Sequence, residues 1–391
     1  MKAIRLLFDA VPDGSAGTNH LYQALVRAIG RTRPEDGELT VLVRHDQDKS
    51  LQENGVRLVR LTLPRGGWLG RFLWYKKRLP DLVQALGANV IYSFSGILSK
   101  TLVKRCGTIT TVNNMLPFTP RSMEKCGRLS KEQLRLFLLH HLYIRSVKLA
   151  DKVLLHSKYA LDMISPYVVG LDAKATVVHS GIPSSLNFKV DVPPPHPYEG
   201  RPYLFYLSAV HPYKNHETLI HAYSKAHRRQ VGMPELLMAG FPSDSATVRS
   251  IETQILKLGL EGHVRYLGPL PRADIAAWLH HATINVFPSS CETNSLILAE
   301  TLGCHGVLAC ANAASMPEIV GDAAMLFDPY DAEALAQLLI TLTADAEKRK
   351  MLQKLAALRK NDFSWDACGV AIWEAARRAA DAYTTRAGVP L

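Results

Sequence analysis

The arrangement of apolar segments along the chain constrains its fold most strongly. Short apolar or β-branched runs typical of strands alternate with longer segments typical of helices, and the alternation occurs twice. The strand-like runs of the first set are KAIRLLFDA, ELTVLVRH, VRLVRLTL, NVIYSF, GTITTVNN, KVLLHS and ATVVHSG; those of the second are YLFYLSA, ELLMAG, HVRYLG, TINVFPS, HGVLAC and AAMLFDP. This pattern predicts an α/β fold with doubly wound parallel sheets.

A proline-rich stretch separates the two sets. SSLNFKVDVPPPHPYEGRP has little periodicity and carries five prolines between Val192 and Pro202, which is typical of a linker. We therefore predict two Rossmann-like domains, at residues 1–185 and 199–363. Ligands of such sheets bind at the carboxyl ends of the strands, so we expect a cleft that both sets of strand ends face.

Length and composition agree with a two-domain globular enzyme. The chain has 391 residues, of which 47% are hydrophobic and 21% charged, enough for two separate cores. It has no apolar run of about 18 residues, and its N-terminus lacks the features of a signal peptide, so we expect a cytoplasmic protein. The six cysteines form no CxxC pair, which argues against a zinc site or a disulfide framework.

The positive charge belongs to the first half of the chain. Residues 1–185 carry 27 Lys and Arg against 14 Asp and Glu, a net charge of +13, whereas the remainder has a net charge of −2. Basic and aromatic residues interleave between Pro64 and Pro80, and a second basic helix follows in RLSKEQLRLFLLHHLYIRSVKLADK. Two explanations stay open: peripheral contact with the anionic inner face of the cytoplasmic membrane, or a solvated charged face. Nucleic acid is not expected, because no recognition motif accompanies the charge.

Two glutamates mark a candidate site in the second half. The segment PSSCETNSLILAETLG carries Glu292 and Glu300, and we expect a helix beginning near Cys291. On one ideal helix the two residues would lie about 12 Å apart along the axis. The carboxyls of a glycosidase are separated by about 5 to 9.5 Å, so two anchors for one long ligand fit better.

The chain resembles the family 4 retaining glycosyltransferases, which have the GT-B fold and an E-x7-E motif. The resemblance is carried by YLSAVHPYKNHETLIHAY, LLMAG, VRYLGPL, INVFPSSCETNSLILAE and SMPEIVGDAAMLFDP, and more weakly by LLFDAVPDGSAGTNHLYQAL, TVNNMLPF, HSKYALDMI and VVHSGIP. NDFSWDACGVAIWEAARRAADAY is similar to the closing helix of that family, so residues 364–385 are expected to pack back on the first domain.

The resemblance implies a role for each matched residue. Glu292 would accept hydrogen bonds from sugar hydroxyls, Glu300 would hold the ribose diol, and Lys214 would stabilise the leaving diphosphate. The diphosphate itself is expected at the helix N-terminus. The remaining donor-binding candidates are Gly17, Ser208, Gly268, Thr293, Asn294, Ser295 and Leu296. Simpler explanations remain for single residues: a capping box formed by Ser289 and Glu292, a surface carboxylate at Glu300, and a solvated turn at Lys214.

The sequence also departs from the family pattern. Asn113 and Asn114 stand where the family often has His-Asp, and an amide cannot take a proton at neutral pH, so Asn113 is a candidate catalytic residue without acid or base function. Ser208 and Ala209 replace a Gly-Arg pair, which removes one of two usual cations. Thr293, Asn294 and Ser295 replace G-F-G, which removes two glycines beside the donor sugar.

These features predict a retaining glycosyltransferase that moves a sugar from a nucleotide-diphosphate donor to a glycan or polyprenyl-linked acceptor in bacterial cell-surface polysaccharide biosynthesis. A sugar-nucleotide epimerase-like enzyme and a non-catalytic nucleotide-sugar-binding subunit are the alternatives. Asp46 and Asp48 have the spacing of a metal-binding pair, but a surface loop explains them better, so we expect no metal and no cofactor.

Overall fold

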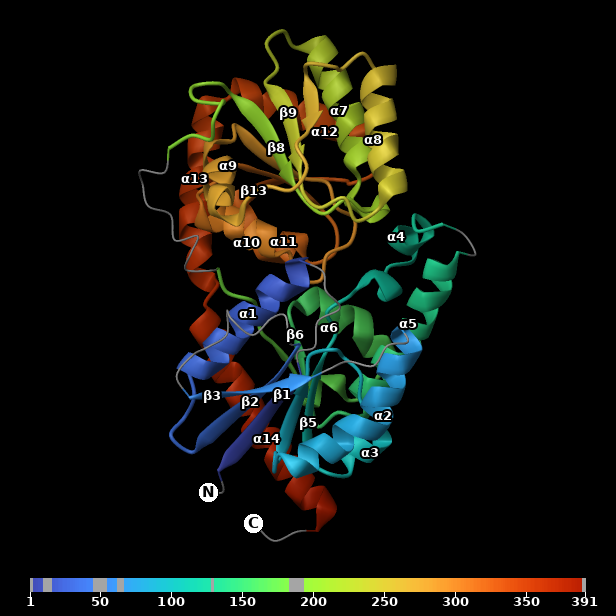
Figure 1. Ribbon diagram of the computed structural model, residues 1–391. Coiled ribbons are helices and arrows are strands. Elements are labelled where there is room, and N and C mark those ends of the chain that lie inside the picture. The colour runs from blue at the N-terminus through green and yellow to red at the C-terminus, as the bar shows by residue number, and fades with distance from the viewer. Residues whose placement is uncertain are drawn as a thin grey trace. The chain divides into compact units, whose positions relative to one another are not determined.

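A computed structural model describes residues 3–9, 16–44, 55–61, 67–127, 130–182 and 193–388. The chain divides into two compact units (Figure 1). Unit 1 comprises residues 1–118, 134–181 and 364–391, and unit 2 comprises residues 119–133 and 182–363. The predicted linker lies partly outside the described residues. The predicted domain limits, 1–185 and 199–363, stay a prediction, and the assignment of 119–133 to unit 2 was not foreseen.

Unit 1 contains a parallel sheet of seven strands in the order β3-β2-β1-β4-β5-β6-β7. The strands are β1 (Ile4–Asp9), β2 (Gly37–Arg44), β3 (Val56–Leu61), β4 (Val90–Ser93), β5 (Gly107–Thr111), β6 (Lys152–Leu155) and β7 (Ala175–Val177). The helices are α1 (Ala16–Arg31), α2 (Gly67–Ala85), α3 (Lys100–Val103), α5 (Lys131–Leu149, in unit 1 from residue 134), α6 (Lys158–Ile164) and α14 (Trp365–Ala387). All seven predicted strands are confirmed.

The C-terminal helix α14 belongs to unit 1, as predicted, and Figure 1 shows it running along the sheet. The indole N–H of Trp373 donates to the carbonyl oxygen of Ile29 in α1 at 2.9 Å. A Cβ at Gly107, the first residue of β5, would lie 2.5 Å from the carbonyl oxygen of Ala379. Glycine at this position therefore lets the backbone of α14 approach the sheet closely.

Unit 2 contains a parallel sheet of six strands in the order β10-β9-β8-β11-β12-β13. The strands are β8 (Tyr203–Leu207), β9 (Glu235–Ala239), β10 (Val264–Tyr266), β11 (Ile284–Phe287), β12 (Leu308–Ala311) and β13 (Ala324–Phe327). The helices are α4 (Pro120–Glu124), α7 (His216–Arg229), α8 (Ser245–Lys257), α9 (Ile275–His281), α10 (Leu296–Gly303), α11 (Met316–Val320), α12 (Ala332–Ala344) and α13 (Ala346–Arg359). Again all six predicted strands are confirmed.

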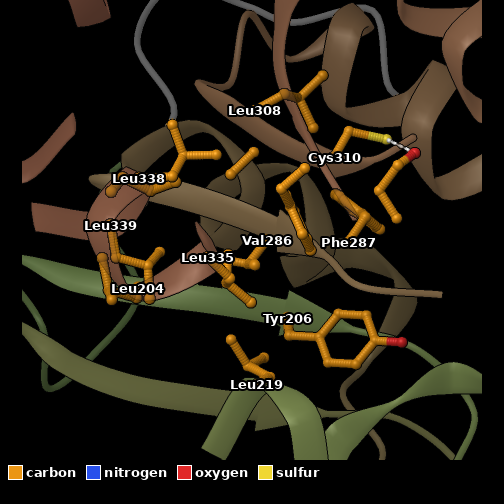
Figure 2. Packing of buried hydrophobic residues seen from close by; sticks show 14 of the residues in the cluster. Leu204, Tyr206, Leu219, Val286, Phe287, Leu308, Cys310, Leu335, Leu338 and Leu339 are labelled. Atoms are coloured by element: carbon orange, nitrogen blue, oxygen red, sulfur yellow. Dashed lines mark hydrogen bonds between the residues drawn. The ribbon is translucent and has the colours of Figure 1, made fainter. Parts of the chain in front are cut away.

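The sheet of unit 2 is buried on both faces. Leu204 and Tyr206 of β8 pack with α7 and α12 in one apolar cluster, part of which Figure 2 shows. Tyr203 and Phe205, which point the other way along the same strand, pack in a second cluster with Trp278 of α9. A strand buried on both faces requires a continuous apolar run, which is why YLFYL is apolar throughout.

Candidate active site

The candidate site of unit 2 lies where the strand order reverses, between β8 and β11. Ligands of doubly wound sheets bind at this point, beyond the carboxyl ends of the strands. Two loops leave the sheet here, at residues 208–215 and 288–295. The side-chain amide of Asn215 donates to the carbonyl oxygen of Pro288 at 2.8 Å, and the backbone N–H of Ser290 donates to the carbonyl oxygen of Tyr213 at 2.9 Å. These bonds hold the two loops together.

Lys214 and Glu292, one from each loop, form an ion pair. The Nζ of Lys214 donates to Oε1 of Glu292 at 2.5 Å, and the two side chains are only 14% and 17% exposed. Burial disfavours the charged form of Lys214, but the Glu292 carboxylate outweighs it and raises the pKa of Lys214 above its ordinary value. The description of Lys214 as a solvated turn residue is therefore wrong. The structure brings together two of the three predicted catalytic residues.

The backbones of this pair are also fixed. The hydroxyl of Tyr206 donates to the backbone carbonyl oxygen of Lys214 at 2.8 Å. The hydroxyl of Ser315 donates to the backbone carbonyl oxygen of Glu292 at 3.2 Å. Tyr206 belongs to β8 and Ser315 immediately precedes α11. Strand and helix thus hold both charged residues at the switch point.

The helix that follows Glu292 begins later than the sequence predicts. α10 begins at Leu296 with Ser295 as its N-cap, so the expected start near Cys291 is wrong. Polar residues that favour turns, from Thr293 to Ser295, separate Glu292 from the helix. The capping box is wrong as well, because Ser289 does not cap a helix and its hydroxyl donates to the carbonyl oxygen of Cys291 at 3.2 Å.

Glu300 lies inside α10 and is buried, so the alternative of a surface carboxylate is wrong. Arg272, which follows β10, binds both of its oxygens. Nη1 donates to Oε2 at 2.9 Å and Nη2 donates to Oε1 at 2.5 Å. Arg272 escaped the sequence analysis because no local pattern connects it with a helix that begins 24 residues later.

The ends of β8 and β9 approach each other closely. Gly240 has a φ of +142°, and a Cβ there would lie 1.8 Å from the carbonyl oxygen of Ser208. The backbone N–H of Gly240 donates to the carbonyl oxygen of Gly268 at 2.9 Å. Two donor-binding candidates, Ser208 and Gly268, are thus connected through a glycine that the sequence analysis did not single out.

A segment from the first half of the sequence, residues 119–133, also borders this site. The hydroxyl of Ser122 lies 3.0 Å from that of Ser290, and Nζ of Lys125 donates to Oδ1 of Asn215 at 2.5 Å. Burial lowers the pKa of Lys125. This cation beside the Lys214 loop was not predicted, because its sequence distance of 90 residues hides the contact.

The third predicted catalytic residue, Asn113, lies in unit 1 beyond the end of β5. Its amide donates to the carbonyl oxygen of Phe94 at 2.8 Å, and its Oδ1 lies 3.1 Å from Nε2 of His156. Burial lowers the pKa of His156 to about 4, so the ring is neutral at neutral pH. Gly17 is the second residue of α1.

Among the residues that the structure describes, no group of three or more His, Cys, Asp and Glu side chains could hold a metal ion. Asp46 and Asp48 lie outside the described residues. In the described part of the chain, no helix has both the length and the apolar character needed to cross a bilayer.

The sequences of known proteins are similar to the second half of the chain. Residues 189–359 match the family described as "Glycosyl transferases group 1". The O-antigen chain mannosyltransferase B of Escherichia coli is 29% identical over 167 residues, which are 42% of this chain and 43% of that protein. A D-inositol 3-phosphate glycosyltransferase of Corynebacterium efficiens is 28% identical over 166 residues, 41% of this chain and 39% of the relative. The match thus spans less than half the length of these relatives.

Solved structures share the fold of the whole chain. A sucrose-phosphate synthase from Thermosynechococcus elongatus has a TM-score of 0.76 at 18% identity, covering 97% of this chain and 100% of that one. Anabaena Alr3699/HepE in complex with UDP and glucose has a TM-score of 0.70 at 18% identity, covering 95% and 98%. These likenesses confirm the predicted GT-B fold. Residues 189–359 are therefore the part of this chain that matches the glycosyl transferases group 1 family.

Proposed function

We propose that this protein is a retaining, metal-independent glycosyltransferase. It moves a sugar from a nucleotide-diphosphate donor to a glycan or polyprenyl-linked acceptor at the inner face of the cytoplasmic membrane, in cell-surface polysaccharide biosynthesis. The observation that supports this most is the buried Lys214–Glu292 pair at the switch point of a group 1 domain. The O-antigen mannosyltransferase among the relatives favours the polysaccharide role.

The pair is suited to exchange partners when a donor binds. A diphosphate at the N-terminus of α10 would take the ammonium of Lys214, because a doubly charged anion attracts it more strongly than one carboxylate does. Glu292 would then be free to accept hydrogen bonds from the sugar hydroxyls. In the structure, each residue neutralises the other.

The reaction that we propose needs no protein base. The bond between the anomeric carbon and the diphosphate oxygen breaks, and a bond to the acceptor oxygen forms on the same face of the sugar. The acceptor proton passes to the leaving phosphate oxygen. Lys214 stabilises the negative charge that develops on that phosphate. Asn113, held by Phe94 and His156, can donate or accept a hydrogen bond but does not transfer a proton.

An assay of nucleoside diphosphate release tests the proposal. The full chain is incubated with UDP-, GDP-, ADP- and TDP-sugars, with and without a membrane-lipid extract as acceptor. Lys214→Ala and Glu292→Ala are each expected to lower turnover at least about a hundredfold, the typical effect of removing one group that stabilises developing charge. Lys225→Ala, an exposed lysine of the same unit, is the matched control.

Three outcomes would contradict the proposal. Turnover by Lys214→Ala equal to that of the unmodified chain would remove the lysine from the reaction. Isomerisation of the donor without acceptor would indicate an epimerase-like enzyme. Nucleotide binding without any turnover would indicate a non-catalytic subunit, the alternative that Asn113 and Ala209 favour.

A further inference from the structure

Helix α5 exposes large apolar side chains in the part of the chain that belongs to unit 1. Leu134 is 61% exposed, Phe137 56% and Leu138 41%. Residues spaced by three and four lie on one face of a helix, so the three side chains adjoin. Tyr167, which is 47% exposed, lies next to this helix, its ring centroid 4.9 Å from that of His140. Figure 1 shows α5 at the margin of unit 1.

Basic side chains continue the same face. His141, Arg145 and Lys148 are exposed and fall in the same arc of about 100° as Leu134, Phe137 and Leu138, at about 100° per residue. The opposite side of the helix is packed into unit 1, through Leu136, Tyr143, Ser146 and Val147. From residue 134 to 149 the helix has no acidic residue. The exposed face, about 20 Å long, thus has an apolar end and a basic end.

We propose that this face of α5 binds an anionic lipid surface. Leu134, Phe137 and Leu138 would enter the boundary between headgroups and acyl chains, while Arg145 and Lys148 contact the lipid phosphates. Combined apolar insertion and basic attraction is how a helix lies in a membrane interface. The net charge of +13 in residues 1–185 adds long-range attraction to the same surface.

Charge favours lipid over the other occupants of such a face. A symmetric dimer through α5 would bring Arg145 and Lys148 toward their own copies, which is repulsive. A nucleic acid would form ion pairs with Arg145 and Lys148, but its phosphate backbone would make no favourable contact with the exposed apolar side chains of the same face.

Vesicle co-sedimentation of the full chain tests this inference without any sugar donor, so its result is independent of the proposed reaction. The vesicles contain equal parts of phosphatidylglycerol and phosphatidylcholine, and pure phosphatidylcholine serves as the comparison. The apolar variant is Leu134→Gln/Phe137→Gln/Leu138→Gln. Its matched control, Leu256→Gln/Met351→Gln/Leu358→Gln, removes three exposed apolar side chains from helices of unit 2. Circular dichroism verifies that both remain folded.

We expect the unmodified chain and the control to bind the anionic vesicles equally. The apolar variant should bind at least about a hundredfold more weakly, since each side chain removed forfeits transfer energy. Arg145→Gln/Lys148→Gln should lose roughly 20-fold, and only on anionic vesicles. The inference is overturned if the apolar variant binds like the control, if the unmodified chain does not bind anionic vesicles, or if it is a dimer that the apolar variant dissociates.

Discussion

Replacing Lys214 by Met and Glu292 by Gln, singly and together, should show strong coupling in the unfolding free energy of unit 2. At 2.5 Å and an effective dielectric constant of about 20, the gross attraction is about 7 kcal/mol. Desolvation of two charges that are 14% and 17% exposed offsets much of it. Each single replacement leaves one buried charge without its partner and should cost about 3–5 kcal/mol, whereas the double replacement should cost far less.

Urea denaturation measured by hydrogen–deuterium exchange of peptides from β8 and β11 reports on unit 2 separately. We expect a coupling energy of at least about 2 kcal/mol. The control cycle is Glu347→Gln and Lys350→Met, an exposed pair on α13 with a distance of 2.8 Å, for which coupling below about 1 kcal/mol is expected. Equal coupling in the two cycles would refute the argument that burial makes the Lys214–Glu292 pair strong.

Three further predictions concern the stability that single residues near the predicted site residues contribute. Gly240→Ala should lower the free energy of unfolding, measured with denaturant, by at least about 3 kcal/mol, because the new Cβ would lie 1.8 Å from a backbone carbonyl oxygen. Gly232→Ala is the control, since a Cβ there meets open space, and it should lower the free energy by only about 1 kcal/mol. Similar losses for the two variants would contradict the close approach at Gly240. The pKa of His156 is about 4 in the folded chain and 6.5 when unfolded, so the chain takes up a proton when it unfolds between these pH values. The free energy of unfolding should therefore fall by about 3 kcal/mol as the pH drops from about 6.5 to about 4. The same pH dependence in a His156→Gln variant would show that His156 is not its cause. Arg272→Ala should lower the free energy of unfolding by about 3 kcal/mol, because it leaves the buried carboxylate of Glu300 without its ion-pair partner. In the same denaturant experiment, Arg272→Ala/Glu300→Gln should recover part of that loss.

Much of the fold could be predicted because its signals are local. Each strand is marked by its own apolar run, and strands such as YLFYL are apolar throughout because both of their faces are covered. Lys214 and Glu292 could be located for a related reason: each lies in the loop that follows a strand, and parallel strands end at one edge of their sheet. The contact between Lys214 and Glu292 is therefore a consequence of topology.

The rest depends on contacts between residues far apart in the sequence. Arg272 approaches Glu300 only after β10 and α10 are in place, and Lys125 approaches Asn215 across 90 residues. An arginine or a lysine in a polar segment has many possible partners, so its sequence context does not indicate a specific one. The start of α10 was misplaced for a different reason: the polar residues 293–295 favour turns, and they delay the helix until Leu296.

In the proposed reaction, Lys214 receives the diphosphate of a nucleotide at the switch point of unit 2. Isothermal titration of the full chain with UDP and with GDP, compared between the unmodified protein and Lys214→Met, measures this contact. We expect that at least one of the two nucleotides binds and that the lysine replacement weakens its binding at least about tenfold, the loss of one charge-assisted contact. Equal affinity of the two proteins for that nucleotide would contradict it.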